Sequence, residues 1–479
     1  MTTLTKIDLK PGLHRESTQY EEDGKWYDGN HVRFRAGKPE NMRGYQTKVS
    51  ATFEGSARDL ITYQSNNNKK RAVFGTPNKL YEHDGDRIVD ITPITTAVTL
   101  ANCFGTSSGS TRVCCSDAAH GRVVGDYVYF TSTAAFNNVS LSTNVYPVIS
   151  VDSANVFTIS VTDAANATGS DTGSATFNYL IPTGNSIAVA GTGYGAASYQ
   201  ATVCASDTRA WNNAASADAT DIVFDITQWS LDNWGDDVIA NRSGSNIFYF
   251  NSDASTVPIR ATSITTSPIS VNSIVVSPND RHLIALGANE YAAATTVSGT
   301  FNPMLVRWSD QDNRTNWVPS VSSTSGEVVL TDGTKIIGGV RAKNAINIWT
   351  DNSLWLMEFA GPPFTFRFQQ AGTNCGLISP HGGIDYNGVT YWMGYDNFYR
   401  FTGQVETLDC TVRRYIFDDI NASYYDKVYA GINSEFKELI WLYPSGDGTE
   451  CDKYVIFNPE DQYWVYGDMI FTTFADKEV

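Results

Sequence analysis

The feature that most constrains this chain is a unit of short apolar segments and turns that recurs along its length. Residues 58–93 contain the apolar runs LITY, RAVFG and KLYEHD, separated by the turn-forming stretches SNNN, TPN and DGD. This alternation is typical of a four-stranded antiparallel meander. In later segments an inner apolar strand is followed by a strand ending in an aromatic residue and then by an amphipathic outer strand. These segments are 221–253, 271–289, 335–370, 382–409 and 427–469.

The units are spaced by roughly 45 to 60 residues, which is within reach of the ~40 to 50 residues of a propeller blade. One four-stranded sheet cannot cover both of its faces, whereas sheets stacked around an axis bury each other's faces and leave only short edges. Packed β-sandwiches are the alternative, but they do not explain why the same aromatic positions recur. The predicted fold class is therefore all-β, a β-propeller of five to six blades.

Two stretches depart from this pattern. Residues 100–183 are rich in Ser, Thr and Ala and contain cleanly alternating strands such as VFTISV, which predicts a small β-barrel or sandwich domain inserted after the first blade. The N-terminal stretch is polar and punctuated by Pro and Gly, as expected of an irregular docking arm. The expected domains are the arm at 1–56, the first blade at 57–99, the inserted domain at 100–183 and the remaining blades at 184–479.

Tryptophans at corresponding strand positions of these units are predicted to pack one blade against the next. These predicted anchors are Trp308, Trp317, Trp349, Trp355, Trp392, Trp441 and Trp464. Helix is scarce, and the one expected helix covers 418–430, with Asp418 or Asp419 as its N-cap.

The charge balance limits the function classes. The chain has 34 Lys and Arg against 51 Asp and Glu, a formal net charge of −17. Such a surface repels phosphates at long range, so ordinary wrapping of nucleic acid is not expected, although an acidic wall past which DNA slides is compatible. The apolar runs are too short to span a bilayer and the N-terminus lacks a signal-peptide core. We expect no membrane segment and synthesis in the cytoplasm.

No motif for cofactor or metal chemistry is evident. Walker-type, HExxH, GxSxG and strand-linked GxGxxG patterns are missing from the sequence, the seven cysteines show no CxxC spacing, and the six histidines are scattered singly. We therefore predict no cofactor, no metal site and no catalytic residues. Carboxylates are plentiful, but most lie in turn contexts in which they satisfy backbone N–H groups.

The stretch VRWSDQDNRTNWVPS, residues 306–320, raises the question of glycosidase activity. It resembles the Asp box, S/T-x-D-x-G-x-x-W, of propeller sialidases through Asp312 and Trp317. However, Asp310 and Arg314 occupy the positions of the Ser/Thr and the Gly, and the motif occurs once. An Asp box stabilises a turn and performs no catalysis, so we interpret Asp310 and Asp312 as turn residues that pair with Arg314.

Several segments together resemble a family of virion proteins of short-tailed bacteriophages. The resemblance lies in VRWSDQDNRTNWVPS, INIWTDNSLWLMEFAGPP, NCGLISPHGGIDYNGVTYWMGYDNFYRFTG, LDCTVRRYIFDDIN and the N-terminal GKWYDGNHVRFRAGKPENMRGY. The family comprises the tail hub or nozzle proteins, also called packaged-DNA stabilisation proteins or tail tubular protein B.

The resemblance implies a structural subunit of the virion tail and not an enzyme. It implies a homohexameric ring below the portal and adaptor, continuation of the DNA channel, and attachment of fibre, spike or needle proteins. We expect the arm to dock on a neighbouring subunit or on the adaptor through Trp26, Arg33 and Arg35. The alternatives are a propeller glycosidase that degrades host surface polysaccharide, and a receptor-binding module whose inserted domain contacts glycans.

Overall fold

The structure is a computed structural model that describes residues 9–47, 49, 51–132, 135–141, 144–171, 173–181, 183, 226–251, 260–292, 299–361 and 364–476. The expected boundary at residue 184 and the beginning of the unit at 221–253 lie outside these residues. In the described part, six four-stranded antiparallel sheets form the blades of a β-propeller, which confirms the predicted fold class.

Each blade is built from four strands that are consecutive in the sequence. Blade 1 contains β3 (Asp59–Gln64), β4 (Lys70–Gly75), β5 (Leu80–His83) and β6 (Ile88–Asp90). Blade 2 contains β15 (Trp229–Trp234), β16 (Asp237–Arg242), β17 (Ile247–Asn251) and β18 (Thr262–Ser263). Blade 3 contains β19 (Val271–Val276), β20 (Leu283–Asn289), β21 (Phe301–Trp308) and β22 (Gly326–Val329).

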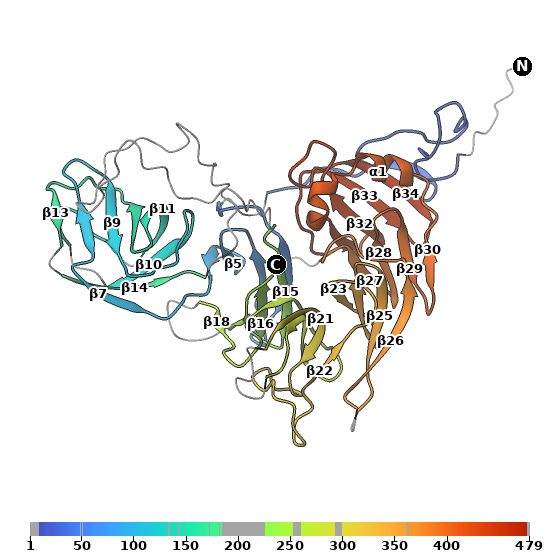
Figure 1. The fold of residues 1–479 in the computed structure, drawn as a ribbon. Helices are drawn as coiled ribbons and strands as arrows, with labels where there is room; N and C mark the ends of the chain where they lie inside the picture. Colours follow the sequence, from blue (N-terminus) through green and yellow to red (C-terminus); the bar gives the residue numbers. More distant parts are fainter. Residues whose placement is uncertain are drawn as a thin grey trace, which may run out of the picture.

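The second half of the ring repeats this arrangement (Figure 1). Blade 4 contains β23 (Ile336–Arg341), β24 (Ile346–Thr350), β25 (Ser353–Phe359) and β26 (Phe366–Thr373). Blade 5 contains β27 (Gly383–Tyr386), β28 (Val389–Met393), β29 (Phe398–Phe401) and β30 (Val405–Thr407). Blade 6 contains β31 (Tyr429–Asn433), β32 (Glu438–Tyr443), β33 (Lys453–Asn458) and β34 (Tyr463–Asp468). The first strand of each blade is innermost and lies beside the first strand of the next blade from β3 through to β31.

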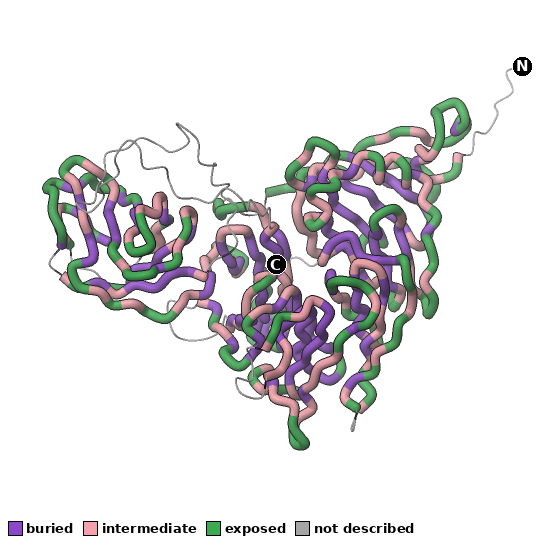
Figure 2. Tube along the Cα trace, viewed as in Figure 1, coloured by how far each residue is buried: buried purple, intermediate pink, exposed green. Residues whose placement is uncertain are grey.

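Every junction between consecutive blades contains an apolar core. Figure 2 shows the buried residues along the strands and the exposed ones mainly at the turns. The Trp229 ring of blade 2 packs with Val73 of blade 1, and Trp349 of blade 4 lies 5.4 Å from Trp392 of blade 5, centroid to centroid. The other three junctions hold comparable clusters. This arrangement follows from the alternation of the strands, which presents apolar side chains to the neighbouring sheet.

The junction that closes the ring, between blade 6 and blade 1, is polar. None of the apolar clusters formed by the described residues joins these two blades. Instead, the Arg58 guanidinium donates to both Glu450 carboxylate oxygens, at 2.5 and 2.7 Å. Lys427 Nζ donates to the same carboxylate at 2.8 Å, and the Tyr429 hydroxyl donates to Asp59 Oδ1 at 3.3 Å.

The inserted domain forms a separate lobe beside blade 1 (Figure 1). Its eight antiparallel strands are ordered β13-β8-β9-β12-β11-β10-β14-β7 and enclose one apolar core that includes Phe130, Phe157 and Phe177. The strands are β7 (Val98–Ala101), β8 (Phe104–Thr106), β9 (Arg112–Ser116), β10 (Tyr127–Ser132), β11 (Val145–Ser153), β12 (Val156–Ser160), β13 (Gly169–Ser170) and β14 (Ser174–Tyr179).

The N-terminal arm packs on blade 6 of its own chain. It contains the hairpin β1 (Val32–Arg35) and β2 (Lys38–Asn41), which forms its own two-stranded sheet beside β34. Upstream of the hairpin, Leu13 N donates to Trp464 O at 2.8 Å, and the buried Leu13 side chain joins the blade 5–blade 6 core. The arm therefore covers a surface of blade 6 that would otherwise be exposed.

The helix prediction was wrong in its position. The α-helix α1 covers Arg413–Asp419, so it ends where a helix was expected to begin. A 3-10 helix, η1 (Ala422–Lys427), follows, and its N-cap is the Asn421 side chain, which accepts from Ser423 N. The prediction of Asp418 or Asp419 as the N-cap was therefore wrong as well, since both residues lie in the last turn of α1.

Candidate functional site

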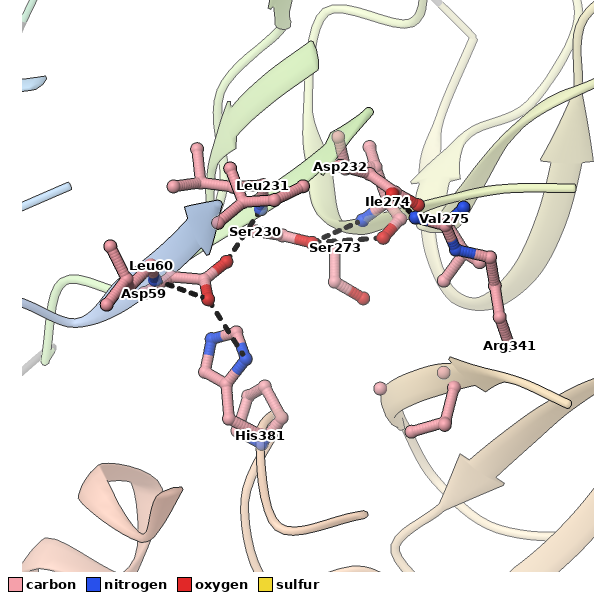
Figure 3. A pocket seen from close by; sticks show the side chains of 15 residues that line it. Asp59, Leu60, Ser230, Leu231, Asp232, Ser273, Ile274, Val275, Arg341 and His381 are labelled. Carbon is pink, nitrogen blue, oxygen red and sulfur yellow. Dashed lines mark hydrogen bonds and ion pairs between the residues drawn. The ribbon is translucent and has the colours of Figure 1, made fainter. Parts of the chain in front are cut away.

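A cavity of about 230 Å³ lies at the centre of the propeller. It is lined by the inner strands β3, β15, β19 and β23 and by Pro380 and His381, which precede β27 (Figure 3). The innermost strand of each blade has one edge without a partner strand. Polar side chains of one inner strand contact this edge on the inner strand of the next blade. The cavity therefore combines residues that are far apart in the sequence.

Asp59 begins β3 and ties blade 1 to blade 2. Its Oδ2 accepts from Leu231 N on β15 at 2.7 Å, and its Oδ1 accepts from its neighbour Leu60 N at 2.8 Å. Burial raises the pKa of Asp59, although His381, the two N–H groups and the Tyr429 hydroxyl each act to lower it. Burial also raises the pKa of Tyr429 well above its ordinary value. This phenol therefore remains a hydrogen-bond donor to Asp59 at neutral pH.

Asp232 ties blade 2 to blades 3 and 4. Its Oδ2 accepts from Val276 N on β19 at 2.6 Å, and its Oδ1 accepts from Asn233 N at 2.7 Å. Arg341, at the end of β23, reaches past blade 3 and donates from Nη2 to Asp232 Oδ1. Burial lowers the pKa of the Arg341 guanidinium.

His381 crosses the centre of the ring from blade 5. Its Nε2 lies 2.8 Å from Trp229 O in blade 2, and its Nδ1 lies 3.8 Å from Asp59 Oδ1 in blade 1. Figure 3 shows the ring directly below the Asp59 carboxylate. Since Trp229 O can only accept, His381 Nε2 carries a proton.

These contacts show what the two central carboxylates do. Asp59 and Asp232 each accept two backbone N–H groups and at least one side-chain donor, so they act as ties between blades. Glycoside hydrolysis requires two carboxylates that face a scissile bond, one of them free to donate a proton to it. At the centre, the described contacts of both carboxylates are of the first kind, ties between blades.

The Asp-box-like stretch lies at the end of β21 and in the loop that leads to β22, within blade 3, and the predicted pairing with Arg314 was wrong. Asp312 pairs with Arg281 at 3.0 Å, and Arg314 pairs with Asp237 of blade 2 at 2.6 Å. The pairing failed because the turn points Arg314 toward the neighbouring blade, where it also lies over the Tyr249 ring at 4.3 Å.

Asp310 is the residue that organises this turn. Its Oδ1 accepts from Thr324 N at 2.8 Å and from the Thr324 hydroxyl at 2.7 Å. Burial raises the pKa of Asp310, but the hydrogen bonds from Thr324, Asn316 and Gln311 outweigh burial and hold it below its ordinary value.

The predicted tryptophan anchors differ in burial. Trp317, Trp349, Trp392, Trp441 and Trp464 are almost completely buried, and Trp308 is 6% exposed. Trp317 lies in the core between blades 2 and 3, whereas Trp308 lies in the core between blades 3 and 4. Trp355 is half-buried at the edge of the latter core.

The three arm residues have different surroundings. Arg33 is buried and pairs with Glu438 of its own blade 6 at 3.0 Å, and its guanidinium lies 3.4 Å from the Phe436 ring centroid. Trp26 is half-buried against Phe34, and Arg35 is exposed. Arg33 therefore makes its ion pair within the chain, while docking of Trp26 and Arg35 on another subunit stays a prediction.

The residues of the central cavity were not predicted from the sequence. The sequence did offer one signal for two of these residues, a polar side chain next to or within an apolar inner strand. Asp59 precedes the apolar run LITY, and Asp232 lies within WSLDNW. No comparable signal marks Arg341 or His381, since their roles depend on the closed ring.

Among the described residues there is no cluster of three or more His, Cys, Asp or Glu that could hold a metal ion. In the same part of the chain, no helix has the length and hydropathy needed to cross a membrane.

No protein-family model matches the chain, and no curated protein matches it. Among solved structures, the phage phi92 endosialidase is 14% identical, with 85% of this chain and 55% of that chain covered and a TM-score of 0.21. The chain thus spans about half the length of that protein. The AfRom2 CNH domain is 10% identical over 51% of this chain and 72% of its own, with a TM-score of 0.33. Apo AztD from Citrobacter koseri is 7% identical over 87% and 96%, with a TM-score of 0.29. At such low scores none of these likenesses carries an argument about function.

Proposed function

We propose that this chain is a structural subunit of a short bacteriophage tail and that it acts as a hub or nozzle protein of the virion. The observation that carries the proposal is the use of the central polar side chains: Asp59, Asp232, Arg341 and His381 hold blades together. The sequence resemblance to tail hub proteins supplies the biological setting. In this proposal the chain has no turnover chemistry.

Ring assembly is the second part of the proposal. Several large apolar side chains protrude into solvent, among them Tyr20 at 91%, Ile470 at 85% and Phe364 at 75% exposure. Exposed apolar groups of this kind often mark surfaces that contact another protein. We propose that such surfaces meet neighbouring copies in a homohexamer, the adaptor on the portal side, and fibre, spike or needle proteins.

The net charge of −17 fits a channel for DNA. A wall that bound phosphates tightly would slow the passage of DNA, whereas an acidic wall repels it. In this proposal the ring continues the DNA channel, helps to retain packaged DNA and then conducts it during ejection.

The mass of the purified chain, alone and mixed with its adaptor, tests this proposal. We expect a particle of six 52.5 kDa chains in the presence of the adaptor and a ring in negative-stain images. A chain that stays monomeric with the adaptor and never enters a virion would overturn the proposal. Release of reducing sugar from host capsule or lipopolysaccharide would favour the glycosidase instead.

Binding of the inserted domain to cells is a separate alternative. This domain stands off the propeller as its own lobe with its own core, which makes it accessible to a partner (Figure 1). Cell binding by the full chain, lost when the lobe is replaced by a short linker while the number of chains in the assembly is unchanged, would favour a receptor-binding role.

A further inference from the structure

The Ser273 hydroxyl is the unexplained polar group of the central cavity. Ser273 lies on β19, is 7% exposed, and its Oγ has no hydrogen-bond partner among the described residues. Figure 3 shows the Ser273 side chain at the wall of the cavity, on the side that faces His381 and Arg341. Leaving a buried hydroxyl without a partner is costly, so each such group in a folded protein needs an explanation.

Arg341 supplies further donors to the same space. Its guanidinium carries five N–H groups, and the contact to Asp232 through Nη2 is the hydrogen bond that it makes within the described part of the chain. The side chain is 38% exposed and lines the cavity, so donors remain for a second acceptor. Arginine commonly shares its planar donor set between two oxygen-bearing groups.

The two carboxylates beside the cavity are already compensated. Asp59 accepts two backbone N–H groups and the Tyr429 hydroxyl, and Asp232 accepts two backbone N–H groups and Arg341. Hydrogen bonds to the charged form stabilise it and reduce its field at a distance. The groups of the cavity that remain for a ligand are the Ser273 hydroxyl and the other N–H groups of Arg341.

The volume of the cavity agrees with a small ligand. About 230 Å³ is several times the ~30 Å³ that one water molecule occupies in the liquid. A metal ion is a poor fit, because it would lie beside the Arg341 charge and would compete with backbone N–H groups for the carboxylate oxygens.

We propose that the central cavity binds a small oxyanion, a carboxylate or a phosphate, which accepts from the Ser273 hydroxyl and from the free N–H groups of Arg341. Bound there, the ligand joins blade 3 to blade 4 at the axis of the propeller. The site does not depend on the proposed ring, since all its residues come from one chain.

Thermal unfolding of the full chain, with the ligand titrated at constant ionic strength, tests this site. The probes are sodium phosphate and sodium acetate, with sodium chloride as the anion that offers no oxygen. We expect a saturable rise in Tm with at least one oxyanion and none with chloride, since a ligand that binds only the folded state stabilises it. A response to phosphate alone or to acetate alone identifies which oxyanion the site takes.

Three variants connect the response to the cavity. Ser273→Ala removes only an unpartnered hydroxyl, so its Tm without ligand should not fall, while its affinity for the oxyanion should fall by about tenfold, the effect of one hydrogen bond to an ion. Arg341→Gln should lose the saturable response. Arg367→Gln, on the outer strand of the same blade, is the matched control and should respond like the wild type.

Two results would overturn the proposal. One is the absence of any saturable response to phosphate and acetate beyond that to chloride, which would leave only water in the cavity. The other is an undiminished response in Ser273→Ala, which would place the bound anion elsewhere. Because Ser273→Ala breaks no contact seen in the structure, this second result can be obtained even if Arg341→Gln fails to fold.

Discussion

The five junctions between consecutive blades are held by apolar packing, whereas the junction that closes the ring is held by polar contacts. At the five, tryptophans and aliphatic side chains bury apolar surface, as Trp349 and Trp392 do between blades 4 and 5. At the closing junction, Arg58 and Lys427 converge on Glu450, and Tyr429 donates to Asp59. Apolar burial is strong and independent of pH, whereas partly exposed ion pairs contribute little and are weakened by salt.

This difference predicts which blade junction of the propeller opens most easily. The chain crosses the closing junction too, from the arm on blade 6 to β3 of blade 1, but no apolar core joins these two blades and no strand is exchanged between them in the described part of the chain. Proteins open first where few apolar contacts hold them, so we expect the junction between blades 6 and 1 to open before the others.

The largest effect is expected from Trp317→Ala, which attacks an apolar junction. Trp317 is 1% exposed and lies in the core between blades 2 and 3. Its truncation should lower the free energy of unfolding by about 3–5 kcal/mol, as for other buried aromatic residues. Chemical denaturation measures this loss, and Trp355→Ala, at a half-buried position, should cost clearly less. A loss below ~1 kcal/mol for Trp317→Ala would contradict the role of the apolar cores.

The second largest loss of folding stability is expected from Gly75→Ala. A Cβ at Gly75 would lie 2.3 Å from an atom of the Trp229 ring in blade 2, so either the ring or the strand must move. Overpacking of this kind costs about 1–3 kcal/mol. Gly105→Ala in the inserted domain is the matched control, because the nearest atom to its added Cβ is 3.8 Å away. Equal stability of the two variants would show that the junction between blades 1 and 2 is loosely packed.

Glu450→Gln attacks the closing junction and should have a smaller effect. Glu450 is 37% exposed on its side chain, and its loss leaves Arg58 and Lys427 without their shared counter-charge. We expect a loss of about 1–2 kcal/mol in the free energy of unfolding, reduced from the value for a buried pair by exposure to solvent. Glu460→Gln, which breaks the exposed pair with Lys437, should change stability by less than ~1 kcal/mol. A cost for Glu450→Gln as large as that for Trp317→Ala would remove the distinction between the two kinds of junction.

The smallest expected effect is the pH dependence of folding stability that Glu450 contributes at the closing junction. Burial raises the pKa of Glu450, but the hydrogen bonds from Arg58 and Lys427 outweigh burial and hold it below the ordinary value of 4.5. A carboxylate with a lowered pKa stabilises the folded state above its unfolded pKa, and this contribution is lost as the pH falls through the folded pKa. The stability difference between wild type and Glu450→Gln should therefore shrink as the pH falls below 4.5. A difference that stays constant in that range would contradict the ion-paired state of Glu450.

The fold could be predicted from the sequence because its determinants are local. Alternating strands, turn residues and recurring aromatic positions indicated a propeller of five to six blades and an inserted β domain. Most of the buried tryptophans of the junctions were predicted for the same reason, since strand alternation decides which side chains face the next sheet, but Trp229 was missed and Trp355 is only half-buried.

The site could not be predicted because its contacts are not local. Asp232 meets Arg341, and Arg33 meets Glu438, only after segments far apart in the sequence have packed together. Local reasoning paired Asp312 with Arg314, whereas the folded turn sends them to Arg281 and Asp237. Side chains at blade junctions take partners from the neighbouring blade, and sequence spacing carries no information about that partner.

Hydrogen–deuterium exchange of the full chain, read strand by strand by mass spectrometry, tests the central claim most directly. We predict that the inner strands β3 and β31 at the closing junction exchange faster than β19 and β23. Glu450→Gln should accelerate exchange in the first pair and leave the second unchanged. Equal protection of all four strands, or acceleration spread evenly around the ring, would contradict a propeller closed by polar contacts.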